Sequence, residues 1–181
     1  HFVWIHFFVQ LSGQVYPAIW TLYVQHKFAW SPLQVGLSLC VVGISSAIVQ
    51  GGLTRVLIPR IGEPKALLWG LIIQSGAFLG FAFVFQGWML YLLIMVSGLA
   101  GIAGPALQSM ITKEIPPAEQ GEFQGSLVSV TSMAAIMAPL IYTRALEAGI
   151  MDFNFAGAPF LVAMLLSLVC FLFLSRSQAR G

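Results

Sequence analysis

Residues 88–111 read WMLYLLIMVSGLAGIAGPALQSMI. This stretch contains no Asp, Glu, Lys or Arg. An α-helix rises about 1.5 Å per residue, so about 20 apolar residues span the hydrocarbon core of a bilayer, which is roughly 30 Å thick. The strands of a membrane β-barrel are shorter, and apolar and polar residues alternate along them. The stretch therefore predicts a transmembrane α-helix.

The rest of the chain repeats this pattern. Turn-forming or charged residues separate six apolar stretches, and we predict one transmembrane helix in each: residues 2–24, 33–58, 66–85, 88–111, 123–145 and 155–174. Only 8% of the 181 residues are charged and 59% are hydrophobic, whereas soluble domains are about a quarter charged. The predicted fold class is an all-α membrane protein, with residues 1–181 forming one bundle of six transmembrane helices.

The charged residues lie at the ends of these predicted helices. A charge at the bilayer centre costs about 2.5–3.5 kcal/mol, and all the acidic residues and nearly all the basic ones fall in loops or within a turn of a helix end. Successive loops alternate between the two sides of the membrane. One side carries Arg55, Arg60, Lys65, Lys113, Arg176 and Arg180, and the other carries Lys27 and Arg144. The excess of cations predicts that the first side, with both termini of the segment, is cytoplasmic.

Several classes of function are not expected. The net charge of +2 is spread over loops without a run of like charge, so we expect no nucleic-acid partner. Cys40 and Cys170 lie in apolar runs without a metal-ligand spacing, so we predict no metal site, no cofactor and no disulfide framework. The helices contain no HExxH motif and no embedded base beside a serine. An enzyme is therefore not expected.

A few polar side chains lie inside the predicted helices. Gln10 and Gln14 are one turn apart on one face of the first helix, and Trp20 continues that side. Two amides inside a membrane need partners, so they either bond to neighbouring helices or line a polar cavity that contacts a substrate. His6, near the interface, is a candidate proton-relay group or a residue of the helix end.

Proline and glycine mark positions where the helices are expected to bend. Proline removes a backbone hydrogen bond and kinks a helix, and bundles tolerate this where the freed carbonyl faces protein or water. Gly104 and Pro105 lie in the fourth predicted helix, Pro139 in the fifth and Pro17 in the first. We predict helix bending at these residues, which suits a gate.

Short strings of the sequence recur, in order and spacing, in a known family. They are Phe28-Ala-Trp-Ser31, Val35-Gly-Leu-Ser-Leu39, Arg60-Ile-Gly-Glu63, Gly87-Trp-Met89, Gly104-Pro-Ala-Leu-Gln108 and Gln120-Gly-x-x-Gln-Gly-Ser-Leu-Val-Ser-Val-Thr-Ser132. With them, residues 28–143 resemble the second half of the bacterial tetracycline-resistance efflux pumps of the major facilitator superfamily. The resemblance extends back to Gln10, Gln14 and Trp20.

This resemblance implies a twelve-helix exporter in which two six-helix halves surround a central cavity, the chain being helices seven to twelve. The implied partners are the lipid bilayer, the missing N-terminal six-helix half, a small-molecule substrate and protons. Proton-coupled export of a small amphipathic compound by alternating access is the implied function, in a bacterial inner membrane. The residues that we expect along the substrate pathway are Gln10, Gln14, Trp20, Ser46, Gln50 and Gln108.

The loop between the second and third predicted helices partly matches a signature of the superfamily. Arg60 and Gly62 agree with it, whereas Glu63 and Pro64 replace basic residues of the signature. In the family this loop contributes to the cytoplasmic gate, so the resemblance assigns Arg60, Gly62 and Lys65 to such a gate. Cations that are merely solvated in a loop account for them equally well.

Two departures concern titratable groups. Where the pumps carry a histidine in the eighth helix this chain has Ser46, and where they carry an aspartate in the ninth it has Gln74. The sequence therefore does not predict tetracycline itself as the substrate. We expect the proton-handling group to lie outside these residues, because no Asp or Glu lies at mid-membrane depth. The alternatives are another major facilitator metabolite transporter and a truncated membrane scaffold that transports nothing.

Overall fold

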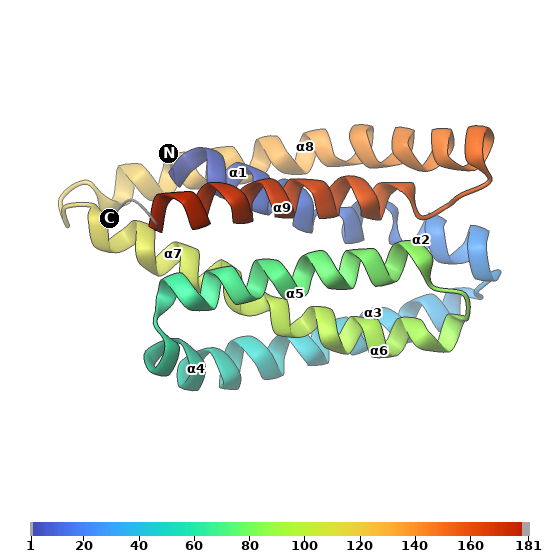
Figure 1. Cartoon of the computed structure of the whole chain (residues 1–181), viewed down its shortest axis with the longest axis horizontal. Coiled ribbons are helices and arrows are strands. Elements are labelled where there is room, and N and C mark those ends of the chain that lie inside the picture. Colours follow the sequence, from blue (N-terminus) through green and yellow to red (C-terminus); the bar gives the residue numbers. More distant parts are fainter. Residues whose placement is uncertain (1, 179–181) are drawn as a thin grey trace.

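The computed structural model describes residues 2–178 of the chain. In this part the protein is a bundle of helices that run along one long axis and are joined by short turns (Figure 1). The helices are α1 (Phe2–Gly13), α2 (Val15–Phe28), α3 (Pro32–Ile48), the π-helix η1 (Val49–Leu53), α4 (Thr54–Ile61), α5 (Glu63–Phe83), α6 (Gly87–Leu99), the 3-10 helix η2 (Ala100–Ile102), α7 (Ala103–Glu114), α8 (Gln120–Phe153) and α9 (Ala158–Gln178).

Within residues 2–178, five helical segments are long and apolar enough to cross a membrane. They are Pro32–Ile61, Glu63–Phe83, Gly87–Lys113, Gln120–Phe153 and Ala158–Ser175. The all-helical fold class predicted from the sequence agrees with this architecture.

The first predicted helix is divided instead of continuous. α1 ends at Gly13 and α2 begins at Val15. Pro17 lacks the N–H that would bond to the Gly13 carbonyl in an uninterrupted helix, and its ring crowds that carbonyl. Each part alone is too short to cross a bilayer, whereas the two in succession cover residues 2–28.

Other helices extend beyond the apolar runs from which they were predicted. α8 continues to Phe153 instead of ending near Ala145. Charged residues in its last turns, such as Asp152, lie exposed at the end of the bundle, so these turns need not be apolar. Asn154 then stops the helix with a left-handed backbone, φ 48°. Hydropathy marks where the apolar run ends, but the helix is free to continue in water.

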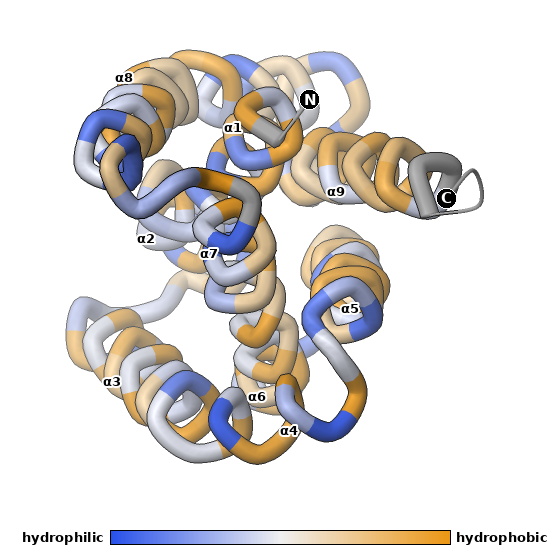
Figure 2. Tube along the Cα trace, turned by 90° about the vertical axis from the view of Figure 1, so that its left-hand side faces the viewer, coloured by the Kyte–Doolittle hydropathy of each residue, from blue (hydrophilic) through white to orange (hydrophobic). Residues whose placement is uncertain are grey.

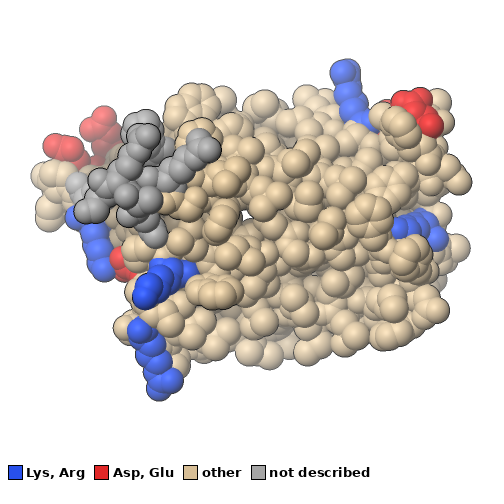
Figure 3. All heavy atoms as spheres, in the orientation of Figure 1, with Lys and Arg blue, Asp and Glu red and all other residues tan. Residues whose placement is uncertain are grey.

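The bundle has two ends, to which the charges are confined. The end with the turn between α4 and α5, the connection from α7 to α8 and the start of α1 is called the Gly62 end, and the opposite end is called the Lys27 end (Figure 1). Figure 3 shows charged side chains at both ends and an uncharged surface between them. Arg180 lies outside the described residues, and nothing is described of the Arg176 side chain.

Aromatic side chains fill the core of the half near the Lys27 end. Phe81 stacks with Phe160 at 5.4 Å between ring centroids, and Tyr23 meets Phe160 edge to face at 4.8 Å. The Tyr23 hydroxyl donates a hydrogen bond to the Phe81 carbonyl at 2.5 Å. A second cluster, of aliphatic side chains around Leu67 and Leu107, fills the half near the Gly62 end.

Seen from the Gly62 end, the helices form two groups (Figure 2). One contains α1, α2, α8 and α9, and the other contains α3, α4, α5 and α6, with α7 between the two groups. The closest association between the groups joins α5 to α9. The candidate site lies where α1 faces η1, α5 and η2.

Candidate functional site

A cavity of about 400 Å³ opens between α1, α2, η1, α5, α6, η2 and α7. This volume lies within the usual range of pockets that hold small molecules, about 300–1,000 Å³. Its polar lining comes from Gln10, Gln50, Gln74, Tyr16 and Ser97.

Three helices depart from regular α-geometry at this cavity. Gly13, at the interruption between α1 and α2, lines it on one side, Gln50 of the π-helix η1 on another, and Gly101 of the 3-10 helix η2 on a third. Short π-helices within α-helices are frequent at functional sites. In a membrane bundle, irregular backbone is tolerated where it is buried in protein or lines a cavity.

The 3-10 turn has a cause in the sequence. Pro105 lacks the N–H that would bond to the Gly101 carbonyl in an α-helix, and η2 lies at that carbonyl. Both residues line the cavity, as does Gly104. A proline of the predicted bending set is therefore part of the cavity wall.

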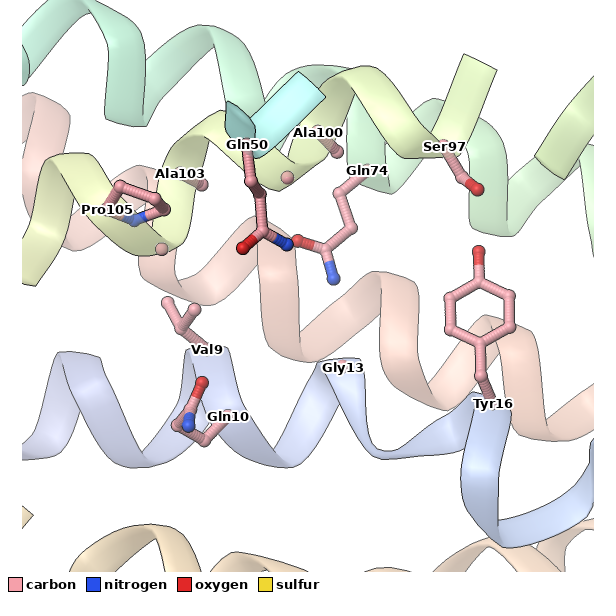
Figure 4. Close-up of a pocket in the computed structure, with 12 residues that line it drawn as sticks. Val9, Gln10, Gly13, Tyr16, Gln50, Gln74, Ser97, Ala100, Ala103 and Pro105 are labelled. Carbon is pink, nitrogen blue, oxygen red and sulfur yellow. The ribbon is translucent and has the colours of Figure 1, made fainter. Parts of the chain in front are cut away.

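Side-chain amides from three helices meet in the cavity. Gln50 and Gln74 point toward one another, and the Gln10 side chain lies beside α1 on the opposite wall (Figure 4). The Gln10 nitrogen is turned toward α8, where Nε2 donates a hydrogen bond to Oγ1 of Thr131 at 3.2 Å. The Gln10 oxygen is turned toward the cavity (Figure 4). All three groups are neutral hydrogen-bonding groups at any physiological pH.

Thr131 connects the cavity wall to His6. Its hydroxyl donates to the Leu127 carbonyl at 2.9 Å, so its oxygen accepts the hydrogen bond from Gln10. Nε2 of His6 lies 3.0 Å from the same oxygen. Because that hydroxyl hydrogen is already used, His6 meets Thr131 as a donor. Thr131 lies in the family-like string that ends at Ser132, but its contact with Gln10 was not predicted from the sequence.

A tyrosine hydroxyl is buried at the edge of the cavity. Among the described residues, the Tyr16 hydroxyl oxygen is inaccessible and has no hydrogen-bond partner. It points toward the Ser97 hydroxyl (Figure 4), which itself donates to the Ile94 carbonyl at 2.9 Å. A polar group buried in this way costs free energy unless a further molecule bonds to it.

The structure brings together only part of the predicted substrate-pathway set. Gln10 and Gln50 line the cavity. Trp20 does not: it is 3% exposed, belongs to the aromatic core and donates from Nε1 to Oγ of Ser38 at 2.9 Å. Gln108 instead donates from Nε2 to Oε1 of Gln124 at 2.9 Å, which links α7 to α8.

The remaining predicted residues also lie apart from the cavity wall. Gln14 is half-buried at the interruption of the first helix, and Ser46 is half-buried on α3. Pro139 is exposed on α8, whose helix is continuous through it. Gln74 lines the cavity, although the sequence pattern marked it only as a departure from the family. Its position as an amide within the apolar run of α5 was the available signal.

The predicted gate loop forms a turn at the Gly62 end. Gly62 has φ +83° and ψ 152°, a backbone conformation that is essentially restricted to glycine. Arg60 and Lys65 are exposed. The residue that makes contacts is Glu63, whose Oε1 accepts from Nζ of Lys113 at 2.7 Å and from the hydroxyl of another α7 residue, Ser109, at 2.5 Å.

Nothing among residues 2–178 resembles a metal centre: no group of three or more His, Cys, Asp or Glu residues is placed to hold an ion.

Comparison with known proteins supports the fold and the resemblance seen in the sequence. Residues 2–180 match the Major Facilitator Superfamily. The chain is 36% identical over 175 residues to the class G tetracycline resistance protein of Vibrio anguillarum, covering 97% of the chain and 44% of that protein. It is 36% identical over 166 residues to the class C protein of Escherichia coli, covering 92% and 41%.

A solved structure shares the same fold. The human organic anion transporter MFSD10 superposes with a TM-score of 0.77 at 25% identity, over 95% of this chain and 39% of that one. The chain thus spans less than half the length of the relatives that it matches. From the family match and the shared helical fold, we conclude that this chain is a multi-pass membrane protein and belongs to the Major Facilitator Superfamily.

Proposed function

We propose that this chain forms one half of a secondary transporter that exports a small amphipathic compound in exchange for protons by alternating access. The observation that carries the proposal is the cavity of about 400 Å³, where three amides and three helix irregularities meet inside an apolar bundle. Such a site binds a small molecule through apolar surface and a few polar anchors. Relatives at 36% identity are named as tetracycline resistance proteins, which favours an exported compound of that general kind.

The proposed partner is a second six-helix half. In their most apolar windows, only 17% of the Pro32–Ile61 segment and 22% of α8 are buried within this chain, against 50% of α5. α8 also exposes Ser126, Ser129 and Ser132. A face with several hydroxyls is better covered by protein or water than by lipid tails. The second half would cover these helices and close the open side of the cavity.

The proposed orientation places the Gly62 end in the cytoplasm of a bacterial cell, with the chain in the inner membrane. Among the described cations, Arg55, Arg60, Lys65 and Lys113 lie at the Gly62 end, and Lys27 and Arg144 at the Lys27 end. This distribution follows the positive-inside rule. A membrane-impermeant thiol reagent applied to intact cells should label Lys27→Cys but not Lys65→Cys, both in a Cys40→Ser background, and the reverse pattern would invert the orientation.

Proton coupling is assigned to the second half of the transporter. No Asp, Glu, Lys, Arg or His side chain lines the cavity of this half. The nearest connected one, His6, is one hydroxyl away from Gln10, through Thr131. In this proposal His6 therefore stabilises the cavity wall and does not carry the transported proton.

Everted membrane vesicles that contain the complete protein test the proposal. An imposed proton gradient should drive uptake of at least one compound from a panel of amphipathic drugs. Gln50→Leu should lower the rate of uptake about three- to tenfold at unchanged membrane abundance, since one lost hydrogen bond is worth about 0.5–1.5 kcal/mol. Gln25→Leu is the matched control, because Gln25 is exposed near the end of α2.

Two outcomes would favour other functions. Gradient-driven movement of metabolites into cells instead of out of them would favour another class of major facilitator transporter. A complete absence of gradient-driven uptake, with the protein folded in the membrane, would favour a scaffold that does not transport.

A further inference from the structure

We propose that the part of the substrate that enters this cavity is uncharged and carries both hydrogen-bond donors and acceptors, as a carboxamide does. This inference concerns the chemical class of the ligand and rests on the proposed function of the cavity as a substrate site.

The first observation is that the cavity contains no charge. None of its twelve lining residues is Asp, Glu, Lys, Arg or His. The charged residues gather at the two ends of the bundle (Figure 3). Along the chain the nearest charge is Arg55, five residues after Gln50, which is about 7.5 Å along a helix. Arg55 is itself a cation, so it offers no compensation to a cationic ligand.

A charged group that enters this cavity would therefore lose its hydration without gaining a partner from this wall. Moving an ion out of water costs several kcal/mol unless an opposite charge and further hydrogen bonds compensate it. A neutral polar group costs much less to bury, and hydrogen bonds from the wall offset that cost. Beside this uncharged wall, the free energy of binding therefore favours a neutral polar group of the ligand over a charged one.

The second observation is the kind of hydrogen bonding that the wall offers. A primary amide presents two N–H donors and one carbonyl acceptor. Gln50 and Gln74 point toward one another in the cavity wall, which thus presents amide donors and acceptors, and the Gln10 oxygen adds an acceptor (Figure 4). The Gln10 nitrogen is already engaged by Thr131. A ligand group that both donates and accepts, such as a carboxamide, matches this set.

The third observation is independent of the amides. The Tyr16 hydroxyl is buried beside the cavity without a partner among the described residues. An unpaired buried hydroxyl costs about 1–3 kcal/mol. The Ser97 hydroxyl beside it lines the cavity, so a polar ligand atom would reach the Tyr16 hydroxyl through Ser97 (Figure 4).

The test compares three probes that share one ring system and differ in charge. They are 2-naphthamide, 2-naphthyltrimethylammonium and 2-naphthoate, and their affinities are measured by equilibrium dialysis against the complete protein in detergent at pH 9. We expect the amide to bind at least about tenfold more tightly than either ion, which corresponds to about 1.4 kcal/mol. Tighter or equal binding of either ion would overturn the inference, as would failure of the amide to bind.

A designed carboxylate gives a second measurement. Gln74→Glu places an anion in the cavity wall, so the preference for the amide over the ammonium ion should shrink by about tenfold or reverse. Gln25→Glu adds the same charge at an exposed position near the Lys27 end and should leave the ratio unchanged. An unchanged ratio in Gln74→Glu would contradict the inference even if the wild-type protein prefers the amide.

These results are separable from those on transport. If vesicles show gradient-driven uptake but the protein prefers an ion, the assignment of ligand class fails and the transport function stands. If the amide preference and the effect of Gln74→Glu are found without any uptake, the transport proposal fails and the cavity remains a site for a neutral ligand.

Discussion

Nζ of Lys113 lies 2.7 Å from Oε1 of Glu63 and so joins the end of α7 to the start of α5. The two residues are far apart in the sequence but meet at the Gly62 end. The Lys113 side chain is 69% exposed and that of Glu63 only 17%. The carboxylate is therefore the enclosed partner, held also by the Ser109 hydroxyl.

Reversing this pair tests its contribution to stability. Glu63→Lys should lower the free energy of unfolding by about 1 kcal/mol, because it sets two like charges together and removes the acceptor for Ser109. The double variant Glu63→Lys with Lys113→Glu should recover part of the loss. Thermal unfolding in detergent measures both, with Glu147→Lys at the exposed surface of the other end as the control. A double variant no more stable than Glu63→Lys alone would show that the pair contributes nothing.

The contact between α5 and the start of α7 depends on a glycine. A Cβ atom at Gly70 would lie 2.7 Å from the Cβ atom and 3.0 Å from the backbone nitrogen of Ala103. Gly70→Ala should therefore push α5 away from the helix that lines the cavity, at a cost of about 1–3 kcal/mol. Gly76→Ala is the control on the same helix, since nothing lies within 4 Å of its added methyl group. Equal unfolding temperatures for the two variants would argue against this close approach.

A tyrosine on α8 supports the interrupted first helix. The Tyr142 hydroxyl, from a fully buried side chain, donates to the Leu11 carbonyl at 2.8 Å, close to the interruption at Gln14. Tyr142→Phe should cost about 1 kcal/mol of stability, because it leaves that hydrogen bond unmade. In Tyr91→Phe the ring that stacks with Trp30 is kept, so stability should change little. Denaturation of the two purified variants measures their stability. An equal loss of stability in Tyr142→Phe and Tyr91→Phe would show that the hydrogen bond from Tyr142 has no special role.

We expect Thr131 to affect transport because it holds the Gln10 side chain in position. Thr131→Val keeps the shape of the side chain and removes the acceptor that holds the Gln10 amide. The amide would then be free to rotate in the cavity, and we expect uptake into vesicles to fall about three- to tenfold. Ser132→Ala, one residue along on the exposed side of α8, should have little effect. Normal uptake by Thr131→Val would show that the orientation of Gln10 is unimportant.

The sequence by itself determined the all-helical membrane class and the family. Long runs such as residues 88–111 contain no charge, and a bilayer admits such runs only as helices that satisfy their own backbone. The irregular backbone between α1 and α2 and at η2 was also partly predictable, since Pro17 and Pro105 each remove one backbone hydrogen-bond donor. The end of α8 at Phe153 was not predictable from hydropathy, because a helix continues into water wherever its residues allow it.

Only the tertiary structure decided which polar residues share the cavity. Gln10, Gln50 and Gln74 come from three helices, and their meeting depends on how those helices rotate and pack. A membrane helix is apolar on nearly all sides, so periodicity does not reveal which face points inward. For the same reason the sequence could not separate Gln50, which lines the cavity, from Trp20, which lies in the aromatic core.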